Sequence, residues 1–191
     1  SRRGPRRYKG EIAAYRLARH LGVRAVPPAY FRTFASAALR GALSPEGARL
    51  FDAEIAGIGG KGEVRGAIMP WIDGLAFAPI EREPMLSEWR RWLAKGGAVR
   101  DADRPRARAI AILVAFDSLA GNWDRWSGGN VGLVDGELLY IDNDGAFMHP
   151  FPEGPFKDQR AALARVERFS RGFVAKVRAL DAASLATAIG D

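Results

Sequence analysis

Apolar residues recur at helical spacing in several stretches of the chain. In the clearest stretch, residues 104–119, they fill most of the interior positions. This pattern predicts a mostly buried central helix, with Asp103 as its N-terminal cap. Residues 10–21 follow the same period and end at Gly22, which predicts a second, amphipathic helix.

Local signals predict the remaining elements. Ser44 followed by Pro45 is typical of a helix start and predicts a helix over residues 45–55. An Ala- and Arg-rich pattern over residues 157–180, interrupted near residues 170–172, predicts further helix, and Asp181 is expected to cap a last helix ending at Ile189. Shorter periodic runs predict a helix at 86–93 and strands at 29–34, 64–69, 131–134 and 138–141.

The dipeptide Asp135-Gly136, between two short apolar runs, is the strongest hairpin signal in the chain. A hairpin brings together the residues that flank its two strands, here Asn130 and Asp142. The pair Asp124-Arg125 lies shortly before Asn130 in a glycine-containing loop. Asp117, near the end of the long helix, is expected to accept hydrogen bonds from this loop or from Arg125 as a structural residue. The sequence therefore predicts one polar site, formed by the loop and both ends of the hairpin.

These residue types suit phosphoryl transfer. The reaction needs a carboxylate that orients or deprotonates the attacking hydroxyl, and hard oxygen ligands for a metal ion. Asp124 is the candidate base, and Arg125 is expected to hold the loop or a neighbouring carboxylate. Asn130 and Asp142 are the candidate metal ligands, with Asp144 as a competing ligand. Asp and Asn also favour turns, so for the segment from Asp142 to Asp144, taken alone, turn formation is the preferred explanation.

Composition narrows the class of protein. The 191 residues are 48% hydrophobic and 27% charged, which is ordinary for one globular domain. No apolar run is long enough to cross a membrane. The chain contains no cysteine, so it has neither disulfides nor thiolate metal sites, in agreement with a cytoplasmic location. The formal net charge is +7, but beyond residues 1–7 the basic residues are scattered between carboxylates, so nucleic-acid binding is not expected as the main function.

Residues 116–125, which end in Asn122-Trp123-Asp124-Arg125, resemble the catalytic-loop entry of the atypical protein-kinase-like enzymes. These include the Fam20 secretory-pathway kinases, the HipA toxins and the bacterial relatives of phosphatidylinositol 3-/4-kinases. The resemblance implies an α+β protein-kinase-like fold. Residues 1–73 would form a partial N-lobe with strands and a helix C, and residues 74–191 a mostly helical C-lobe with the metal-site hairpin. It also implies ATP and Mg²⁺ or Mn²⁺ as cofactors, and a hydroxyl acceptor on a protein, a lipid or a small molecule.

Two segments of the predicted N-lobe resemble the same family. Glu11 resembles the helix-C glutamate that pairs with a phosphate-binding lysine, which would then lie upstream of Ser1. A carboxylate in the first turn of a helix also suits the helix dipole without such a partner. Residues 66–71 resemble the last N-lobe strand and the hinge, so Met69 and Trp71 are candidate nucleotide-binding residues. For Trp71, packing between the lobes is favoured over covering the adenine.

The sequence departs from the family pattern in three ways. Trp126 stands where the pattern has His, and the spacing from Asp124 to Asn130 is one position longer than usual. The glycine-rich loop and the lysine strand that should precede Glu11 are not among these residues, so we expect the chain to be a fragment of a longer one. The alternative is a pseudokinase-type binding or scaffold domain without turnover. A metal-dependent phosphohydrolase fits less well, because the histidines and extra carboxylates of such sites are missing.

Overall fold

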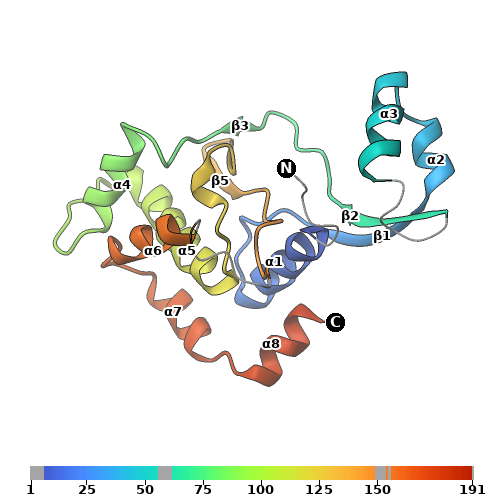
Figure 1. Ribbon diagram of the computed structural model, residues 1–191. Coiled ribbons are helices and arrows are strands. Elements are labelled where there is room, and N and C mark those ends of the chain that lie inside the picture. Colours follow the sequence, from blue (N-terminus) through green and yellow to red (C-terminus); the bar gives the residue numbers. More distant parts are fainter. Residues whose placement is uncertain (1–6, 56–61, 149–153, 155, 191) are drawn as a thin grey trace.

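The computed structural model describes residues 7–55, 62–148, 154 and 156–190. The chain is a mixed α and β protein in which helices predominate and the strands form two small antiparallel sheets (Figure 1). Within the described residues, no helix combines the length and the apolar character needed to cross a membrane. The helices are α1 (Arg7–Leu21), α2 (Ser36–Gly41), α3 (Pro45–Glu54), α4 (Met85–Leu93), α5 (Arg104–Ala120), α6 (Phe156–Ala164), α7 (Arg171–Arg178) and α8 (Ala182–Ile189), with short 3-10 turns η1 (Asp101–Asp103) and η2 (Arg125–Ser127). The strands are β1 (Tyr30–Ala35), β2 (Glu63–Ile68), β3 (Ala76–Phe77), β4 (Val131–Val134) and β5 (Glu137–Tyr140).

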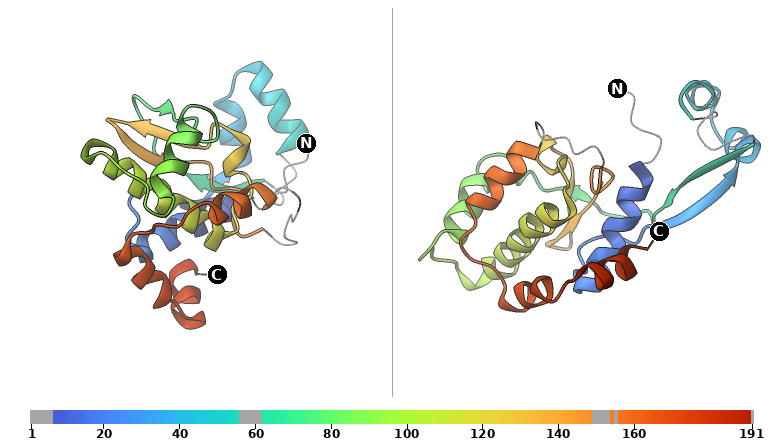
Figure 2. Two further views of the ribbon diagram at one scale, coloured as in Figure 1. Left: turned by 90° about the vertical axis from the view of Figure 1, so that its left-hand side faces the viewer. Right: turned by 60° about the horizontal axis from the view of Figure 1, so that its bottom comes forward.

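Helix α5 forms the centre of the main body. Its residues Ile110, Leu113, Val114 and Phe116 are completely buried, and α4, α6 and β5 pack against it. Burying a large apolar side chain contributes about 1.5–3 kcal/mol, so these four residues make α5 a firm support for the loop that follows it. Helices α7 and α8 run alongside α1 on the other side of the body (Figure 2). The prediction of a buried central helix is thus confirmed.

Strands β1 and β2 pair along their whole length, from Tyr30 opposite Ile68 to Ala35 opposite Glu63. Together with α2 and α3 they extend away from the main body as an arm (residues 30–55 and 62–68; Figures 1 and 2). The hydroxyl of Ser44 accepts a hydrogen bond from the Gly47 backbone N–H at 3.2 Å, as expected of the cap of α3. The arm contains both predicted strands and the predicted helix between them.

The second sheet has the order β3-β4-β5, and β4 and β5 form the predicted hairpin. Val131 lies opposite Tyr140 and Val134 opposite Glu137, so only two residues form the turn. Both have positive φ, 50° for Asp135 and 83° for Gly136. This conformation matches the twist of the strands and is the reason an Asp-Gly pair predicts a hairpin here.

Two details of the predicted helices are wrong. Asp103 makes no capping hydrogen bond at the start of α5; instead its carboxylate accepts from the Arg100 Nε at 2.6 Å. The pattern over residues 157–180 is two helices rather than one interrupted helix, because α6 ends at Ala164 and α7 begins only at Arg171. The cap at Asp181 is confirmed, since its carboxylate accepts from the Ser184 backbone N–H at 2.7 Å.

Candidate active site

Arg125 lies at the centre of the loop that follows α5. Its Nε donates to Oδ2 of Asp117 at 2.8 Å and its Nη2 donates to Oδ1 at 3.1 Å, and both side chains have no exposed surface. Asp117 belongs to the last turns of α5, and the helix ends at Gly121, whose φ of 64° lets the chain reverse. The two-point ion pair therefore fixes the loop to the end of the buried helix, as predicted for Asp117 and Arg125.

The same guanidinium joins the two ends of the β4–β5 hairpin. Its Nη1 donates to the backbone oxygen of Asn130, just before β4, and to that of Ile141, just after β5, the latter at 2.5 Å. Its Nη2 also donates to the side-chain oxygen of Asn143 at 2.6 Å. Asp124 immediately precedes Arg125, and Asp142 immediately follows Ile141. One side chain thus brings together the loop and the hairpin segments that carry the three main candidate residues.

Asn130 is oriented by the loop itself. Its Nδ2 donates to the backbone oxygen of Asp124 at 2.7 Å and to the hydroxyl of Ser127 at 3.3 Å. Because the nitrogen is used in this way, the amide oxygen is left without a hydrogen-bond partner among the described residues. That oxygen is the atom that a hard cation would bind. On the other side of Asp124, the Asn122 side-chain oxygen accepts from the Asp124 backbone N–H at 3.2 Å.

Glu11 reaches the site from the first turns of α1. Its two carboxylate oxygens accept from the backbone N–H of Asn143 at 2.5 Å and from the Asn143 side chain at 3.1 Å. The carboxylate is therefore used to hold the segment after β5, whereas the sequence suggested a lysine partner. Helix α1 also lies close against this segment, since a Cβ on Gly10 would come within 2.5 Å of the backbone oxygen of Ala146.

Burial controls the electrostatics of both interior carboxylates. It raises the pKa of Glu11 above its ordinary value, with the hydrogen bonds from Asn143 acting in the opposite direction and the nearby Asp142 adding to the rise. Burial likewise raises the pKa of Asp117, opposed by the charge and the hydrogen bonds of Arg125. Both side chains are held by donors rather than exposed to solvent, so their geometry indicates positioning residues.

The positively charged side chain of Arg7 lies between Asp124 and Asp144, two of the candidate site residues. The Nη2 of Arg7, at the start of α1, donates to Oδ2 of Asp124 at 3.2 Å and also to Oδ1 of Asp144. The guanidinium lies 5.6 Å from the centre of the Trp123 ring, and the three charged side chains are only 14–20% exposed. The Nε of Arg7 is buried without a partner in the described part of the chain. Arg7 thus neutralises the candidate base and holds Asp144 at the same time.

Asp142 and Asp144 do not share a strand face, as an extended continuation of β5 would have required. Asp142 has a left-handed backbone with φ of 53° and is exposed, whereas Asp144 is turned towards Arg7. Among the described residues, no three His, Asp or Glu side chains are grouped so that they could hold a metal ion. A metal at this site would therefore depend on the amide oxygen of Asn130 and the carboxylate of Asp142, with its remaining ligands from a nucleotide and water.

The two hinge candidates are not tied to this site. Met69 is 47% exposed and Trp71 is 90% exposed, and in the described structure no hydrogen bond or ring contact links either of them to the loop or the hairpin. The preferred prediction for Trp71, packing between lobes, is wrong, because its ring lies in solvent. Their role in nucleotide binding stays a prediction.

Three residues of the site were not identified from the sequence. Arg7 was only one member of a basic cluster, and Asn143 was only a turn former, although its position directly after Asp142 was a usable signal. Trp126 is partly buried against the core: its indole N–H donates to Oε1 of Gln159 at 2.5 Å, and its ring centre lies 5.9 Å from that of Trp89. An aromatic side chain therefore anchors the loop where the family pattern has His.

Comparison with known proteins gives no relative from which the role of this site could be inferred. The chain matches no protein-family model, and no match was found among curated proteins or among solved structures. The resemblance of residues 116–125 to the kinase-like families and the kinase-like arrangement of the fold therefore stay predictions.

Proposed function

We propose that this chain is a kinase-type phosphotransferase that uses ATP and Mg²⁺ or Mn²⁺ to phosphorylate a hydroxyl group on a protein, a lipid or a small molecule. The observation that carries the proposal is the position of Arg125. Its guanidinium binds Asp117, the two ends of the β4–β5 hairpin and Asn143. These contacts hold together the chain segments that carry Asp124, Asn130 and Asp142, which supports the proposal because phosphoryl transfer needs a carboxylate base and oxygen ligands for a metal.

Each residue has a role that follows from its contacts. Asp124, whose backbone is fixed by Asn122 and Asn130, orients the acceptor hydroxyl and takes its proton. The oxygen of Asn130 and the exposed carboxylate of Asp142 hold the cation, while Glu11 positions the Asp142 segment through Asn143. Magnesium-bound ATP, when present, supplies the phosphoryl group and the charge that stabilises its transfer.

The adenine would lie near the end of β2, where Met69 and Trp71 are exposed. Within this proposal, residues 1–73 correspond to a partial N-lobe and residues 74–191 to a C-lobe of a kinase-like fold. The cysteine-free composition supports a cytoplasmic location.

The second candidate is a nucleotide-binding or scaffold domain without turnover, and the contacts of Arg7 favour it. The guanidinium occupies Oδ2 of Asp124, the oxygen that a base would offer to a hydroxyl. Arg7 would have to move before this oxygen could accept a hydrogen bond from a hydroxyl group.

Parallel measurements of ATP binding and of ADP formation separate the two candidates. The kinase proposal expects magnesium-dependent ADP formation by the wild type, abolished in Asp124→Asn while ATP binding is kept. Binding without ADP formation supports the scaffold instead. A folded wild type that neither binds ATP nor forms ADP overturns the kinase proposal and the nucleotide-binding form of the second candidate, and leaves a scaffold domain.

A further inference from the structure

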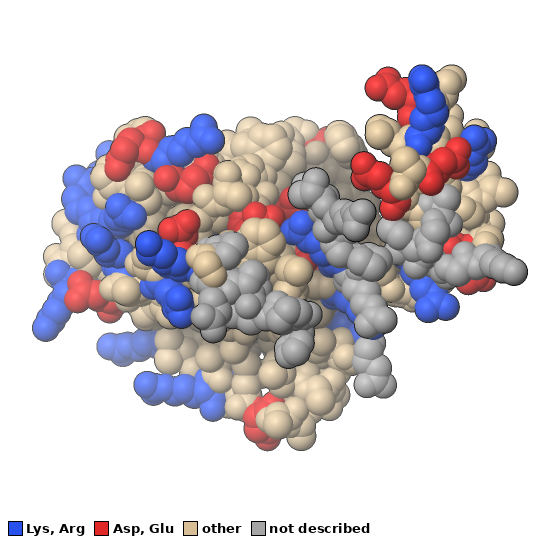
Figure 3. Space-filling view, in the orientation of Figure 1, with Lys and Arg blue, Asp and Glu red and all other residues tan. Residues whose placement is uncertain are grey.

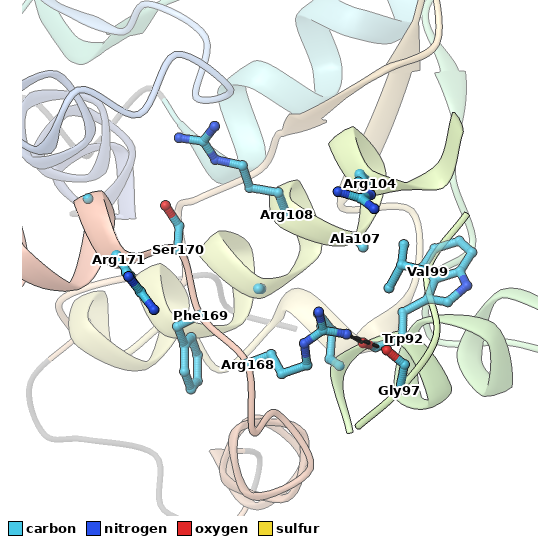
Figure 4. A pocket seen from close by; sticks show the side chains of 13 residues that line it. Trp92, Gly97, Val99, Arg104, Ala107, Arg108, Arg168, Phe169, Ser170 and Arg171 are labelled. Atoms are coloured by element: carbon cyan, nitrogen blue, oxygen red, sulfur yellow. Dashed lines mark hydrogen bonds between the residues drawn. The ribbon is translucent and has the colours of Figure 1, made fainter. Parts of the chain in front are cut away.

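A cavity lies away from the candidate active site, near the N-terminal end of α5. It has a volume of about 690 Å³ and is formed between the end of α4, the first half of α5 and the segment that leads into α7 (Figure 4). Its lining residues on α5 extend only as far as Ala111, six residues before Asp117, a separation of about 9 Å along the helix axis. The cavity is therefore independent of the proposed phosphotransfer site.

All charged side chains that line this cavity are basic. Its lining contains four arginines, Arg104, Arg108, Arg168 and Arg171, and no acidic side chain, a formal charge of +4. Figure 4 shows Arg104 and Arg108 extending from α5, Arg168 from the segment before α7, and Arg171 from the first position of α7. On the molecular surface, Lys and Arg side chains also gather over α4 and α7 (Figure 3).

Two of these guanidinium groups are already occupied. Arg168 donates through Nη1 to the backbone oxygens of Trp92, at 3.0 Å, and Gly97, at 2.5 Å. Arg104 pairs with Asp101 at 2.8 Å, but both side chains are largely exposed, so this pair is weak.

Arg108 and Arg171 differ from them. Within the described residues, neither has a hydrogen bond or an ion pair, and Ser170, which directly precedes α7, makes no capping hydrogen bond. Two unpaired guanidinium groups and a hydroxyl therefore line one cavity. Guanidinium groups match the geometry of phosphate oxygens, and two of them balance the charge of a phosphate dianion.

The rest of the lining is apolar. Trp92, Leu93, Ala107 and Ala111 are almost fully buried, and Val99 and Phe169 are partly buried beside them. A cavity of this size, with apolar walls and a few polar groups, is typical of a small-molecule site. A bare inorganic anion would use the arginines but leave the apolar walls without a partner.

We propose that this cavity binds a small organic phosphate, with the phosphate group on Arg108, Arg171 and Ser170 and an apolar body against Val99 and Phe169. A neighbouring cavity shares Arg104 and Arg108 with this one, but it is also lined by Asp101 and Glu137, so it is less favourable for an anion.

The test is a calorimetric titration of the intact chain with 1-naphthyl phosphate, compared with inorganic phosphate and with 1-naphthol. We expect naphthyl phosphate to bind at least about tenfold more tightly than either fragment, since a charge-assisted hydrogen bond alone contributes on that order. In the double variant Arg108→Gln/Arg171→Gln its affinity falls by a similar factor. The matched control is Arg32→Gln, which removes an exposed charge from β1, and it keeps the wild-type affinity.

Three results would overturn the proposal. Equal binding by 1-naphthol shows that the phosphate is not recognised, and equal binding by inorganic phosphate shows that the apolar walls are not used. An equal loss in the Arg32→Gln control shows a general charge effect. Because Arg108 and Arg171 are exposed, unchanged thermal melting of the double variant verifies that any loss of binding is local.

Discussion

Replacing Arg125 by Met tests whether one buried side chain holds the candidate site together. The substitution leaves the Asp117 carboxylate in the interior without its cation, which costs about 3–5 kcal/mol. Three further acceptors, the backbone oxygens of Asn130 and Ile141 and the side chain of Asn143, lose a donor. Each such bond contributes about 0.5–1.5 kcal/mol. Since domains have a total unfolding free energy of about 5–15 kcal/mol, a loss of about 4 kcal/mol or more is expected to leave the variant barely stable.

Urea unfolding followed by circular dichroism and tryptophan fluorescence measures this loss. A double-mutant cycle with Asp117→Asn separates the ion pair from the other contacts, because the double variant contains no stranded charge. We expect the two substitutions to be coupled by about 2 kcal/mol or more. The double variant should therefore lose clearly less unfolding free energy than the two single variants lose together.

The arm provides a matched control. Arg40 and Asp52 form a similar two-point pair at 2.8–3.0 Å, but their side chains are 55% and 45% exposed. Arg40→Met is therefore expected to leave the urea midpoint unchanged, because water screens the pair and solvates what remains. If Arg125→Met unfolds at the same urea concentration as Arg40→Met, or if its effect adds to that of Asp117→Asn without coupling, the reasoning is refuted.

Three further predictions concern Glu11, the assigned helix caps and Arg7. Because burial raises the pKa of Glu11 in the folded state above its ordinary value of 4.5, the stability that Glu11 contributes is fully present below pH 4.5 and is lost as the pH rises through the folded pKa. The unfolding free energy of the wild type, minus that of Glu11→Gln, should thus fall as the pH rises above 4.5 in urea titrations, and a constant or rising difference contradicts this. Asp181→Ala should lower the melting temperature by a few degrees, because it removes a capping box, whereas Asp103→Ala should not, because Asp103 caps nothing; equal shifts in calorimetric scans would show that the assigned caps are wrong. Arg7→Gln should tighten magnesium–ATP binding severalfold in calorimetric titrations, because it removes the ion pair between Arg7 and Asp144, the competing metal ligand; weaker binding would instead indicate that Arg7 contacts the phosphates.

Local signals were sufficient for much of the fold. The turn at Asp135-Gly136 requires two left-handed residues that few other pairs tolerate, and this dipeptide located the turn correctly, although β5 begins and ends one residue earlier than predicted. The apolar interior of α5 and the cap at Asp181 were equally informative. Asp103 was misassigned because an acidic residue before a helix is only a candidate cap, and here Arg100 competes for its carboxylate.

The site could be predicted only where its contacts are set by residues that lie close together in the sequence. The hairpin necessarily brings Asn130 and Asp142 together, and Arg125 was expected to bind a carboxylate near the loop. The contacts of Arg7 with Asp124 and Asp144 join residues more than 100 positions apart, so no local pattern could reveal them. The exposure of Trp71 likewise depends on how the arm leaves the main body, which no residue near Trp71 encodes.

The most direct test of the proposed active site is a calorimetric titration of the chain with ATP, with and without Mg²⁺. We predict binding that requires Mg²⁺, that is lost in Asp142→Ala, and that is kept in Asp101→Ala, which removes an exposed carboxylate at the other end of α5. Binding that is independent of Mg²⁺, or equal in Asp142→Ala and the wild type, would contradict the role of Asp142 as a metal ligand. Absence of any ATP binding by the folded chain would contradict the nucleotide site itself.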